Sequence, residues 1–234
     1  MMINLSERLQ KVASFIPIGS VLADIGSDHA YLPIYTMQNN ITKMAIAGEV
    51  AEGPFQAAKA SVMANELSDL IEVRKGDGLA VIHKEDLVDC ITICGMGGPL
   101  IASILDKGKD KIGANTRLVL QPNIASHAVR KWLIDEKWEL ITETILEEDG
   151  HIYEILVAER GNPLKPYHNA EKEIYFGPFL LKEKSEVFRK KWAHERKEWE
   201  RIYKQLENVE ERDAIKQKKE QLMKYMTWYE EERL

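Results

Sequence analysis

Acidic side chains stand beside glycines at three places in the first half of this 234-residue chain. They occur in Asp24-Ile25-Gly26, in Gly48-Glu49 and in Gly76-Asp77-Gly78. A short apolar segment precedes each of them, which predicts a buried strand that ends in a turn. A single acid in such a turn is most simply a helix cap or a turn residue. Three at successive strand ends indicate one shared pocket, because ligands of open α/β sheets bind at the carboxyl edge.

The types of these residues predict what the pocket binds. An acid at the tip of the second strand, Glu49, can accept hydrogen bonds from both hydroxyls of a ribose. Asp77, which stands between two glycines, could accept a hydrogen bond from an adenine amino group. Asp28 occupies the place of the second glycine in the dinucleotide pattern G-x-G-x-x-G that would start at Gly26. Its carboxylate would repel a pyrophosphate and attract a cation, so we expect an adenosyl ligand with a positively charged end.

A second cluster of glycines follows the fourth predicted strand, in Cys94-Gly95-Met96-Gly97-Gly98. These glycines either let a ligand or a base approach the backbone closely or simply form a flexible turn. Cys94 is more simply a small core residue than a nucleophile, since no base is identifiable beside it. After the fifth predicted strand, the amide of Asn123 could hold the edge of a base or cap the next helix.

Two ring-bearing residues lie just beyond the first glycine turn. His29, next to Asp28, is either a proton shuttle or a loop residue. Tyr31 either stacks on a base or packs against other side chains. The histidines and cysteines do not have the spacing of a metal site, so we expect no metal.

Seven apolar segments predict the strands that carry these turns, and amphipathic segments between them predict helices. The last two strands are joined by Glu148-Asp149-Gly150, in which Asp-Gly is a strong hairpin signal. This order describes an α/β fold with a doubly wound, mostly parallel seven-stranded sheet and an antiparallel strand at one side. The predicted strands are 21–26, 44–50, 71–74, 89–94, 117–120, 140–147 and 151–158, and the predicted helices are 5–16, 32–39, 54–67, 99–105 and 128–138.

A connector with glycine and two prolines, at 160–166, divides the chain. We expect one domain at 1–160 and a helical domain at 166–234. Apolar residues of the second domain follow a seven-residue repeat, which predicts a helical hairpin with a coiled-coil seam. They are Phe188, Trp192, Trp199, Ile202, Leu206 and Val209, followed by Ile215, Leu222, Met226 and Tyr229.

The net charge of −6 argues against a basic surface over the whole protein. Residues 1–165 hold 16 Lys and Arg against 23 Asp and Glu, whereas 166–234 hold 16 against 15. The basic rows of the second part are either a solvated charged face or a surface for phosphates. Only two cysteines occur, and we find neither a signal-peptide layout nor an apolar run long enough to cross a membrane. We therefore expect a cytoplasmic protein without a membrane partner.

Five segments together resemble the bacterial tRNA adenine-N1 methyltransferase family, whose members modify position 22 of tRNA. They are Asp24–Pro33 (DIGSDHAYLP), Gly48-Glu49, Gly76-Asp77-Gly78, Gly95-Met96-Gly97-Gly98 and Gln121-Pro122-Asn123. The likeness covers nearly the whole chain. It implies a Rossmann-like, class I S-adenosylmethionine-dependent methyltransferase fold, a C-terminal coiled-coil domain and tRNA as the substrate. The motif D/E-x-G-x-G-x-G of the wider class is D-I-G-S-D-H-A here, so the usual roles of its second and third glycines do not carry over.

The residues and the resemblance together indicate three groups of site residues. Those expected to bind S-adenosylmethionine are Asp24, Gly26, Ser27, Glu49, Asp77, Gly78, Cys94, Gly95 and Gly97. Those expected at the reacting adenine are Asp28, His29, Tyr31, Met96 and Asn123. Those expected to contact tRNA are Lys182, Arg189, Lys190, Lys191, Arg196 and Lys197. We expect the protein to act as a monomer.

Two other classes of function stay open at this point. One is a methyltransferase that acts on another RNA, a small molecule or a protein, whose activity would not depend on the basic helices or on salt. The other is a non-catalytic scaffold whose helical hairpin binds a partner, and such a protein would not bind S-adenosylmethionine.

Overall fold

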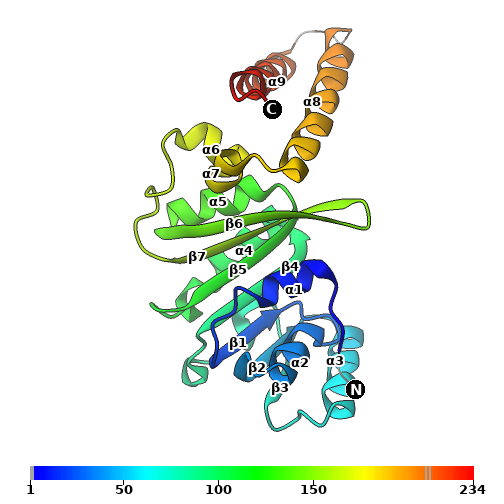
Figure 1. Ribbon diagram of the computed structural model, residues 1–234, viewed down its shortest axis with the longest axis vertical. Coiled ribbons are helices and arrows are strands. Elements are labelled where there is room, and N and C mark those ends of the chain that lie inside the picture. Colours follow the sequence, from blue (N-terminus) through cyan, green and yellow to red (C-terminus); the bar gives the residue numbers. More distant parts are fainter. Residues whose placement is uncertain (1–2, 209, 211) are drawn as a thin grey trace. The chain divides into compact units, whose positions relative to one another are not determined.

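The computed structural model describes residues 3–208, 210 and 212–234, which divide into two compact units between Phe179 and Leu180 (Figure 1). Within these residues the first unit contains a seven-stranded sheet with the order β3-β2-β1-β4-β5-β7-β6. The strands are β1 (Ser20–Ile25), β2 (Thr42–Glu49), β3 (Ile71–Lys75), β4 (Cys90–Gly97), β5 (Arg117–Ile124), β6 (Trp138–Glu148) and β7 (His151–Arg160). The predicted doubly wound, mostly parallel sheet is confirmed.

The predicted hairpin is present, and its antiparallel strand β7 lies at one side of the sheet, next to the outermost strand. β7 pairs antiparallel with both β5 and β6, so it lies between them. Asp149 and Gly150 at the hairpin turn have φ of 51° and 76°, the left-handed values that a two-residue turn between antiparallel strands requires. β6 therefore becomes the outer strand, and the chain returns through β7 to close against β5.

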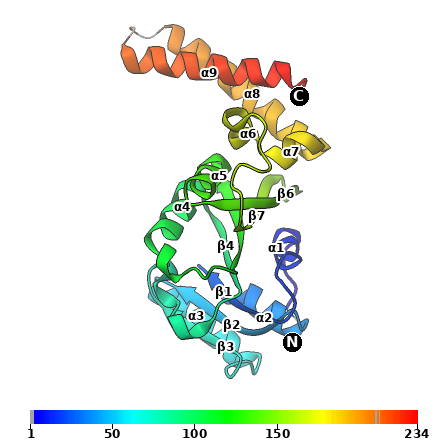
Figure 2. The same cartoon turned by 90° about the vertical axis from the view of Figure 1, so that its left-hand side faces the viewer.

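Helices cover both faces of the sheet (Figure 2). One buried cluster contains residues of α1, α2 and α3, and the other contains residues of α4 and α5. Successive residues of β1, Leu22 and Ala23, belong to opposite clusters, as the alternation of a strand requires. The helices of this unit are α1 (Glu7–Ala13), α2 (Tyr31–Gln38), α3 (Glu52–Ala64), α4 (Gly98–Lys107), α5 (Ser126–Asp135) and α6 (Ala170–Phe176), with the short turns η1 (Gly78–Val81), η2 (Lys84–Asp86) and η3 (Lys109–Lys111).

The helix predicted at 128–138 ends earlier than expected. α5 stops at Asp135, and Lys137 takes a left-handed φ of 61° that turns the chain. Trp138 then begins β6, where it pairs with Arg160 of β7. Its indole is fully buried, and the Arg160 guanidinium lies 4.0 Å from the ring centre. Burial of this large aromatic surface in the sheet outweighs the helical pattern of the segment before it.

A buried ionic cluster ties the segment after β7 to the sheet. The Arg130 side chain of α5 is fully buried and donates to Glu143 of β6 at 2.5 Å and to Glu154 of β7 at 2.6 Å. Arg130 also donates to the backbone carbonyl of Ile174 at 3.3 Å, and Glu143 accepts from the backbone N–H of Phe179 at 3.2 Å. Paired carboxylates and a guanidinium can be buried together because each satisfies the other.

This cluster explains where the two units divide. The connector at 160–166 predicts a boundary there, but α6, which was not predicted as a separate helix, is held against α5 by the Arg130 contacts. A side chain at Gly177 would also meet the Arg130 and Glu143 side chains. Residues 166–179 therefore belong to the first unit, and the division falls after Phe179.

The second unit contains a helical hairpin. α7 (Pro178–Glu183) spans the division and leads to α8 (Glu186–Glu207) and α9 (Asp213–Glu231). Trp199 of α8 lies 5.6 Å from Tyr225 of α9, and Arg196 lies 3.1 Å from Glu230, so the two helices run antiparallel. The predicted hairpin is confirmed, whereas the coiled-coil seam stays a prediction. Val209 of the predicted repeat lies outside the described residues.

Replacement of Arg130 by alanine should strongly destabilise the first unit. Two buried carboxylates would lose their cation, which typically costs about 3–5 kcal/mol. Urea denaturation monitored by tryptophan fluorescence would measure the loss. The matched control is Lys43→Ala, which removes an exposed ion pair with Asp89 and should leave the midpoint almost unchanged. Equal midpoints for the two variants would contradict this account.

Candidate functional site

The structure brings the predicted turns to one edge of the sheet. Asp77 follows β3, Glu49 ends β2, Asp28 follows β1, Gly95 lies at the end of β4 and Asn123 at the end of β5. Because these parallel strands are neighbours in the order β3-β2-β1-β4-β5, the turns stand in a row along the carboxyl edge. The order of the strands reverses between β1 and β4, the point at which ligands bind in open α/β sheets.

The turn after β1 has an unusual backbone. Gly26 has φ of 71°, and three non-glycine residues, Asp28, His29 and Ala30, follow with left-handed values of 36°, 58° and 56°. Such residues cost about 1–3 kcal/mol each and persist only where the surroundings hold them. Here the N–H of Gly26 donates to the Gly48 carbonyl at 2.9 Å, and the N–H of Asp28 donates to the Glu49 carboxylate at 2.7 Å. The turn is thus fixed against β2.

The Asp24 side chain links the turn after β1 to β4. Its carboxylate is buried and accepts hydrogen bonds from the Ser27 hydroxyl and from the Thr92 hydroxyl, both at 2.6 Å. Burial raises the pKa of Asp24 from 3.8 to about 6, and the two hydroxyl donors counteract only part of this effect. Asp24 therefore supports the turn from inside the protein and does not line an open surface.

The turns after β1 and β4 touch each other at Gly26. A Cβ atom at Gly26 would overlap the Cε methyl of Met96, which would have to move, and the left-handed φ of Gly26 also favours glycine. A Cβ at Gly98 would overlap the backbone carbonyl of Ala125, which brings the start of α4 against the turn after β5. The glycines thus permit close approach of backbone and side chains, and Gly95 adds a left-handed φ of 75°.

A network of side-chain amides holds the Gly95 turn. Asn123 donates to the Gly95 carbonyl at 2.8 Å, and Gln121 donates to the Asn123 side-chain oxygen at 3.0 Å. The side-chain oxygen of Gln121 accepts from the Gly95 N–H at 3.0 Å and from Arg8 of α1. Asn123 does not cap the next helix, because the residue at the cap of α5 is Ala125. Sequence reasoning does not indicate a role for Arg8 in the site, because in the sequence Arg8 is one charged residue of an amphipathic helix.

Two aromatic side chains, His29 and Tyr31, lie just after Asp28 in the chain. The imidazole of His29 stacks on Tyr31 at 5.2 Å between ring centres, and its Nε2 lies 3.7 Å from the Asp28 carboxylate. The Asp28 side chain is 85% exposed and Tyr31 is 42% exposed, so both are accessible to a ligand. On β4, burial raises the pKa of the Cys94 thiol and so favours its protonated form.

The residues expected to contact tRNA lie on α7 and α8 of the second unit. Lys182 is on α7, and Arg189, Lys190, Lys191, Arg196 and Lys197 are on α8. Arg189 donates to the Arg233 carbonyl at 3.1 Å, and Arg196 is partly buried and pairs with Glu200 and with Glu230 of α9. Its partners assign it to the contact between α8 and α9.

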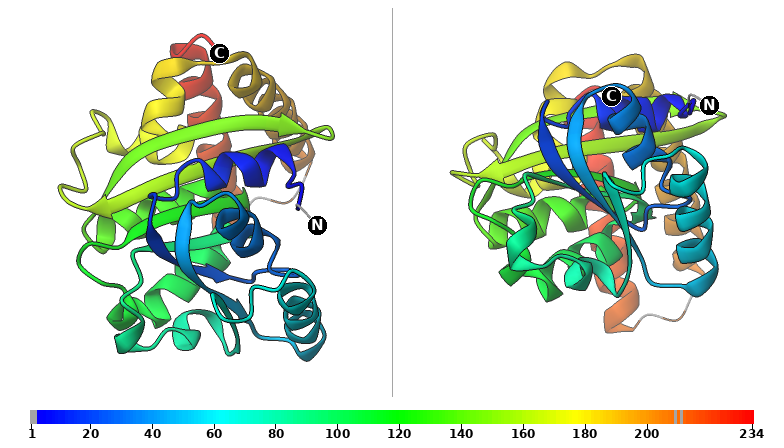
Figure 3. Two further views of the ribbon diagram at one scale, coloured as in Figure 1. Left: turned by 60° about the horizontal axis from the view of Figure 1, so that its bottom comes forward. Right: turned by 90° about the horizontal axis from the view of Figure 1, so that it is seen from below.

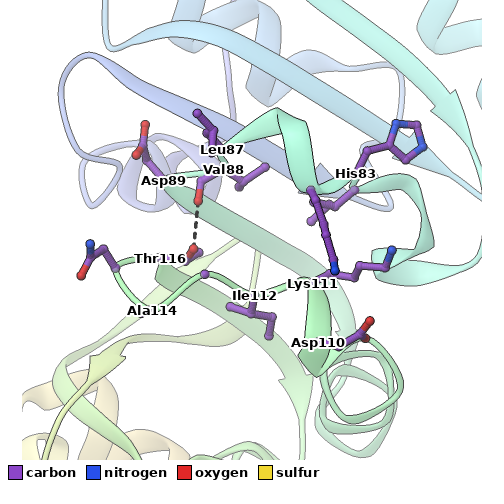
Figure 4. A pocket seen from close by; sticks show the side chains of 13 residues that line it. His83, Leu87, Val88, Asp89, Asp110, Lys111, Ile112, Ala114 and Thr116 are labelled. Atoms are coloured by element: carbon purple, nitrogen blue, oxygen red, sulfur yellow. Dashed lines mark hydrogen bonds between the residues drawn. The ribbon is translucent and has the colours of Figure 1, made fainter.

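A hollow lies at the opposite edge of the sheet (Figure 4). It has a volume of about 440 Å³ and is lined by Asp89, which precedes β4, and by Thr116, which precedes β5. The Thr116 hydroxyl donates to the Val88 carbonyl at 2.9 Å. This hollow is at the amino ends of the strands and contains none of the predicted site residues, so its size alone does not make it the functional site.

The described residues also bear on metal binding and on membrane insertion. None of the groups of histidine, cysteine, aspartate and glutamate found among them is arranged to hold a metal ion. Within the same residues, every helix is too short or too polar to cross a membrane.

The sheet order and the acidic and glycine-rich turns at its carboxyl edge define a methyltransferase of the Rossmann-like class. The chain belongs to the tRNA (adenine(22)-N(1))-methyltransferase family, whose model matches residues 22–230. It is 50% identical over 222 residues to the tRNA (adenine(22)-N(1))-methyltransferase of Bacillus subtilis, covering 94% of this chain and 93% of that protein.

Solved structures agree with this membership. The crystal structure of the B. subtilis m1A22 tRNA methyltransferase has a TM-score of 0.94 and 49% identity, covering 98% of this chain and 99% of that one. A Streptococcus pneumoniae protein described as a putative tRNA (m1A22) methyltransferase, solved with S-adenosyl-L-methionine, has a TM-score of 0.83 and 44% identity, covering 95% and 100%.

Replacement of Asp24 by asparagine should change stability in a pH-dependent way. At pH 4 the folded wild-type protein holds Asp24 protonated, so burial of the group costs little. Above its folded pKa of about 6 a buried carboxylate must be maintained, and asparagine relieves that cost, by up to about 3 kcal/mol. Denaturation midpoints of both proteins at pH 4 and pH 7 would test this. A difference between the proteins that is the same at both values would contradict it.

Proposed function

We propose that this protein transfers the methyl group of S-adenosylmethionine to N1 of adenine 22 in tRNA. The observation that carries the proposal is the contact between Gly26 and Met96, where the acidic turns of β1 to β3 meet the glycine turn of β4. The turns after β1, β2 and β3 form a donor half of the edge, and the turns after β4 and β5 form an acceptor half. The methyl group would pass between them at this contact.

The donor half fits an adenosyl ligand with a cationic end. Glu49 is nearly buried at the tip of β2, and one of its oxygens already holds the Asp28 N–H, so its carboxylate is oriented to accept from the ribose hydroxyls. Asp77 and Gly78 stand beside it to receive the adenine. The Gly26–Ser27 turn leaves room for close approach of the ligand, and Asp24 supports that turn from inside. Cys94, Gly95 and Gly97 border the ligand from β4.

S-adenosylmethionine supplies a methyl group that is already activated on a sulfonium. Adenine N1 carries a lone pair and no proton at neutral pH, so the protein need not provide a general base or a metal. Its task is alignment of the base with the methyl group. The exposed Asp28 carboxylate stabilises the positive charge that develops on the ring, and the stacked His29 and Tyr31 provide a surface for the base. Met96 and Asn123 border the base on the other side.

The second unit handles the rest of the tRNA in this proposal. N1 lies on the pairing edge of adenine, so the base must be unpaired or flipped, at a cost of a few kcal/mol. The basic side chains of α7 and α8 bind phosphates and position the RNA without reading its sequence. Lys182, Arg189, Lys190, Lys191 and Lys197 take this role, whereas Arg196 stabilises the helical hairpin. We infer that the enzyme acts as a monomer in the cytoplasm, where its RNA substrate is made.

The direct test is methyl transfer to unmodified tRNA. The purified protein, incubated with S-adenosylmethionine and a tRNA transcript, should produce 1-methyladenosine at position 22, mapped by nuclease digestion and mass spectrometry. A transcript with guanine at position 22 is the matched control and should remain unmethylated. Methylation of a different position, of a small molecule or of a protein in place of A22 would contradict the proposal.

Substitutions of Glu49 and Asp28 should affect different steps, one the binding of S-adenosylmethionine and the other the methyl transfer. Glu49→Gln should weaken binding of S-adenosylmethionine about tenfold, since a ribose acceptor loses its charge. Asp28→Asn should lower kcat by at least about tenfold with little effect on that affinity, since the carboxylate acts on the charge of the product. Calorimetry and steady-state kinetics would separate the effects. The control is Glu52→Gln, whose exposed carboxylate pairs with Lys75. Identical profiles for Glu49→Gln and Asp28→Asn would refute the division.

Removal of basic charge from the second unit should weaken tRNA binding. A variant with Lys182, Lys190 and Lys197 replaced by alanine should have a higher KM for tRNA, a smaller dependence on salt, and unchanged affinity for S-adenosylmethionine. In the matched control, alanine replaces Lys43, Lys84 and Lys111, which lie toward the amino ends of the strands. If the control variant loses tRNA affinity and the helix variant does not, the RNA surface is elsewhere.

A further inference from the structure

Arg8 occupies a place in the acceptor half of the edge that neither the sequence motifs nor the family match indicates. It lies on α1, which runs beside β6 (Figure 3). Its Nη1 donates to the side-chain oxygen of Gln121, and its guanidinium carbon lies 5.0 Å from the centre of the Tyr153 ring on β7. A Cβ atom at Gly95 would be 4.0 Å from the same nitrogen. Arg8 thus stands between β7 and the turn after β4.

Arg8 and the Gly95 N–H together determine which way the amide of Gln121 points. The Gln121 side chain is completely buried and could be placed with its oxygen and nitrogen exchanged. Arginine only donates hydrogen bonds, so the side-chain oxygen must face Arg8, where it also accepts from the Gly95 N–H at 3.0 Å. The amide nitrogen must then face Asn123, to which it donates at 3.0 Å.

The same constraint extends from Gln121 to both polar groups of Gly95. Because the Asn123 oxygen accepts from Gln121, the Asn123 nitrogen faces the Gly95 carbonyl, to which it donates at 2.8 Å. The Gly95 N–H and carbonyl are therefore both held, one by each amide. The charged donor on α1 thus reinforces the orientation that the two amides take around Gly95, a left-handed glycine that begins the turn toward Met96.

We propose that Arg8 is a positioning residue for methyl transfer, acting through Gln121 and Asn123 on the Gly95–Gly98 turn that receives the acceptor adenine. The inference rests on the proposed function, since it concerns the base bound by that turn. Its chemical basis is alignment, because a displacement of about 1 Å at the reacting centre can cost about 100-fold in rate. The guanidinium does not touch the base in this account.

An arginine is suited to this place in a way that lysine is not. The planar guanidinium can lie over the Tyr153 ring while one of its nitrogens donates to Gln121. A lysine could donate to Gln121 but would not present a flat face to the ring. We therefore expect Arg8→Lys to retain more activity than Arg8→Ala.

The test is the kinetics of the full-length protein on tRNA. Arg8→Ala should lower kcat about 10- to 100-fold, with the affinity for S-adenosylmethionine unchanged in calorimetry and with partial rescue in Arg8→Lys. The matched control is Arg117→Ala, because Arg117 donates to the Phe15 carbonyl just beyond the other end of α1 and pairs with Glu159. Arg117 holds the chain just after α1 at the opposite edge of the sheet, away from the acceptor half. The kcat of Arg117→Ala should therefore equal that of the wild type.

A double-mutant cycle completes the test. If Arg8 acts through Gln121, the variant that combines Arg8→Ala with Gln121→Ala should be no slower than Gln121→Ala alone. Three results would each overturn this inference: an unchanged kcat in Arg8→Ala, an equal loss in Arg117→Ala, or multiplicative losses in the double variant. In each case, methylation of A22 by the wild-type protein would still uphold the proposed function. A wild-type protein that methylates no tRNA would overturn both.

Discussion

The buried Asp24 carboxylate is the interaction on which the site depends. It accepts hydrogen bonds from Ser27 in the turn after β1 and from Thr92 on β4, the two strands between which the order of the sheet reverses. The left-handed run at Asp28, His29 and Ala30 begins directly after this anchor. Burial of the carboxylate opposes ionisation, as its pKa of about 6 shows, so the protein keeps an unfavourable group where the turn needs an acceptor.

From this point the edge of the sheet divides into two halves with different chemistry. Carboxylates and a tight glycine turn follow β1, β2 and β3, and they suit a cationic adenosyl donor. Glycines and amides follow β4 and β5, and they leave the backbone open to a base. The acidic excess of residues 1–165 thus belongs to the unit that would hold the donor, whereas the basic rows lie on the helices that would hold RNA.

Apolar segments and turn residues in the sequence predict the sheet, the hairpin at Asp149-Gly150 and the grouping of acids and glycines at one edge. These features depend on local patterns, because each strand and each turn is encoded in a few neighbouring residues. The left-handed conformation of Asp28, His29 and Ala30 has no such pattern, since neighbouring strands impose it.

Contacts between distant residues account for what sequence reasoning missed. Arg8 and Gln121 are 113 positions apart, and Arg130 meets the Ile174 carbonyl from 44 positions away. The first pair places a helix at the acceptor half, and the second moves the boundary between the units from the connector at 160–166 to Phe179. No periodicity marks either pair, so only the folded chain shows them.

A crystal structure of this protein with S-adenosylhomocysteine tests the central claim most directly, because the claim concerns where the donor binds. The account predicts that the ribose hydroxyls contact Glu49, that the adenine lies beside Asp77 and Gly78, and that the sulfur points from Gly26 toward the Gly95 turn. A ligand whose ribose and adenine lie at the turn after β5, or in the hollow at the opposite edge beside Asp89 and Thr116, would contradict it.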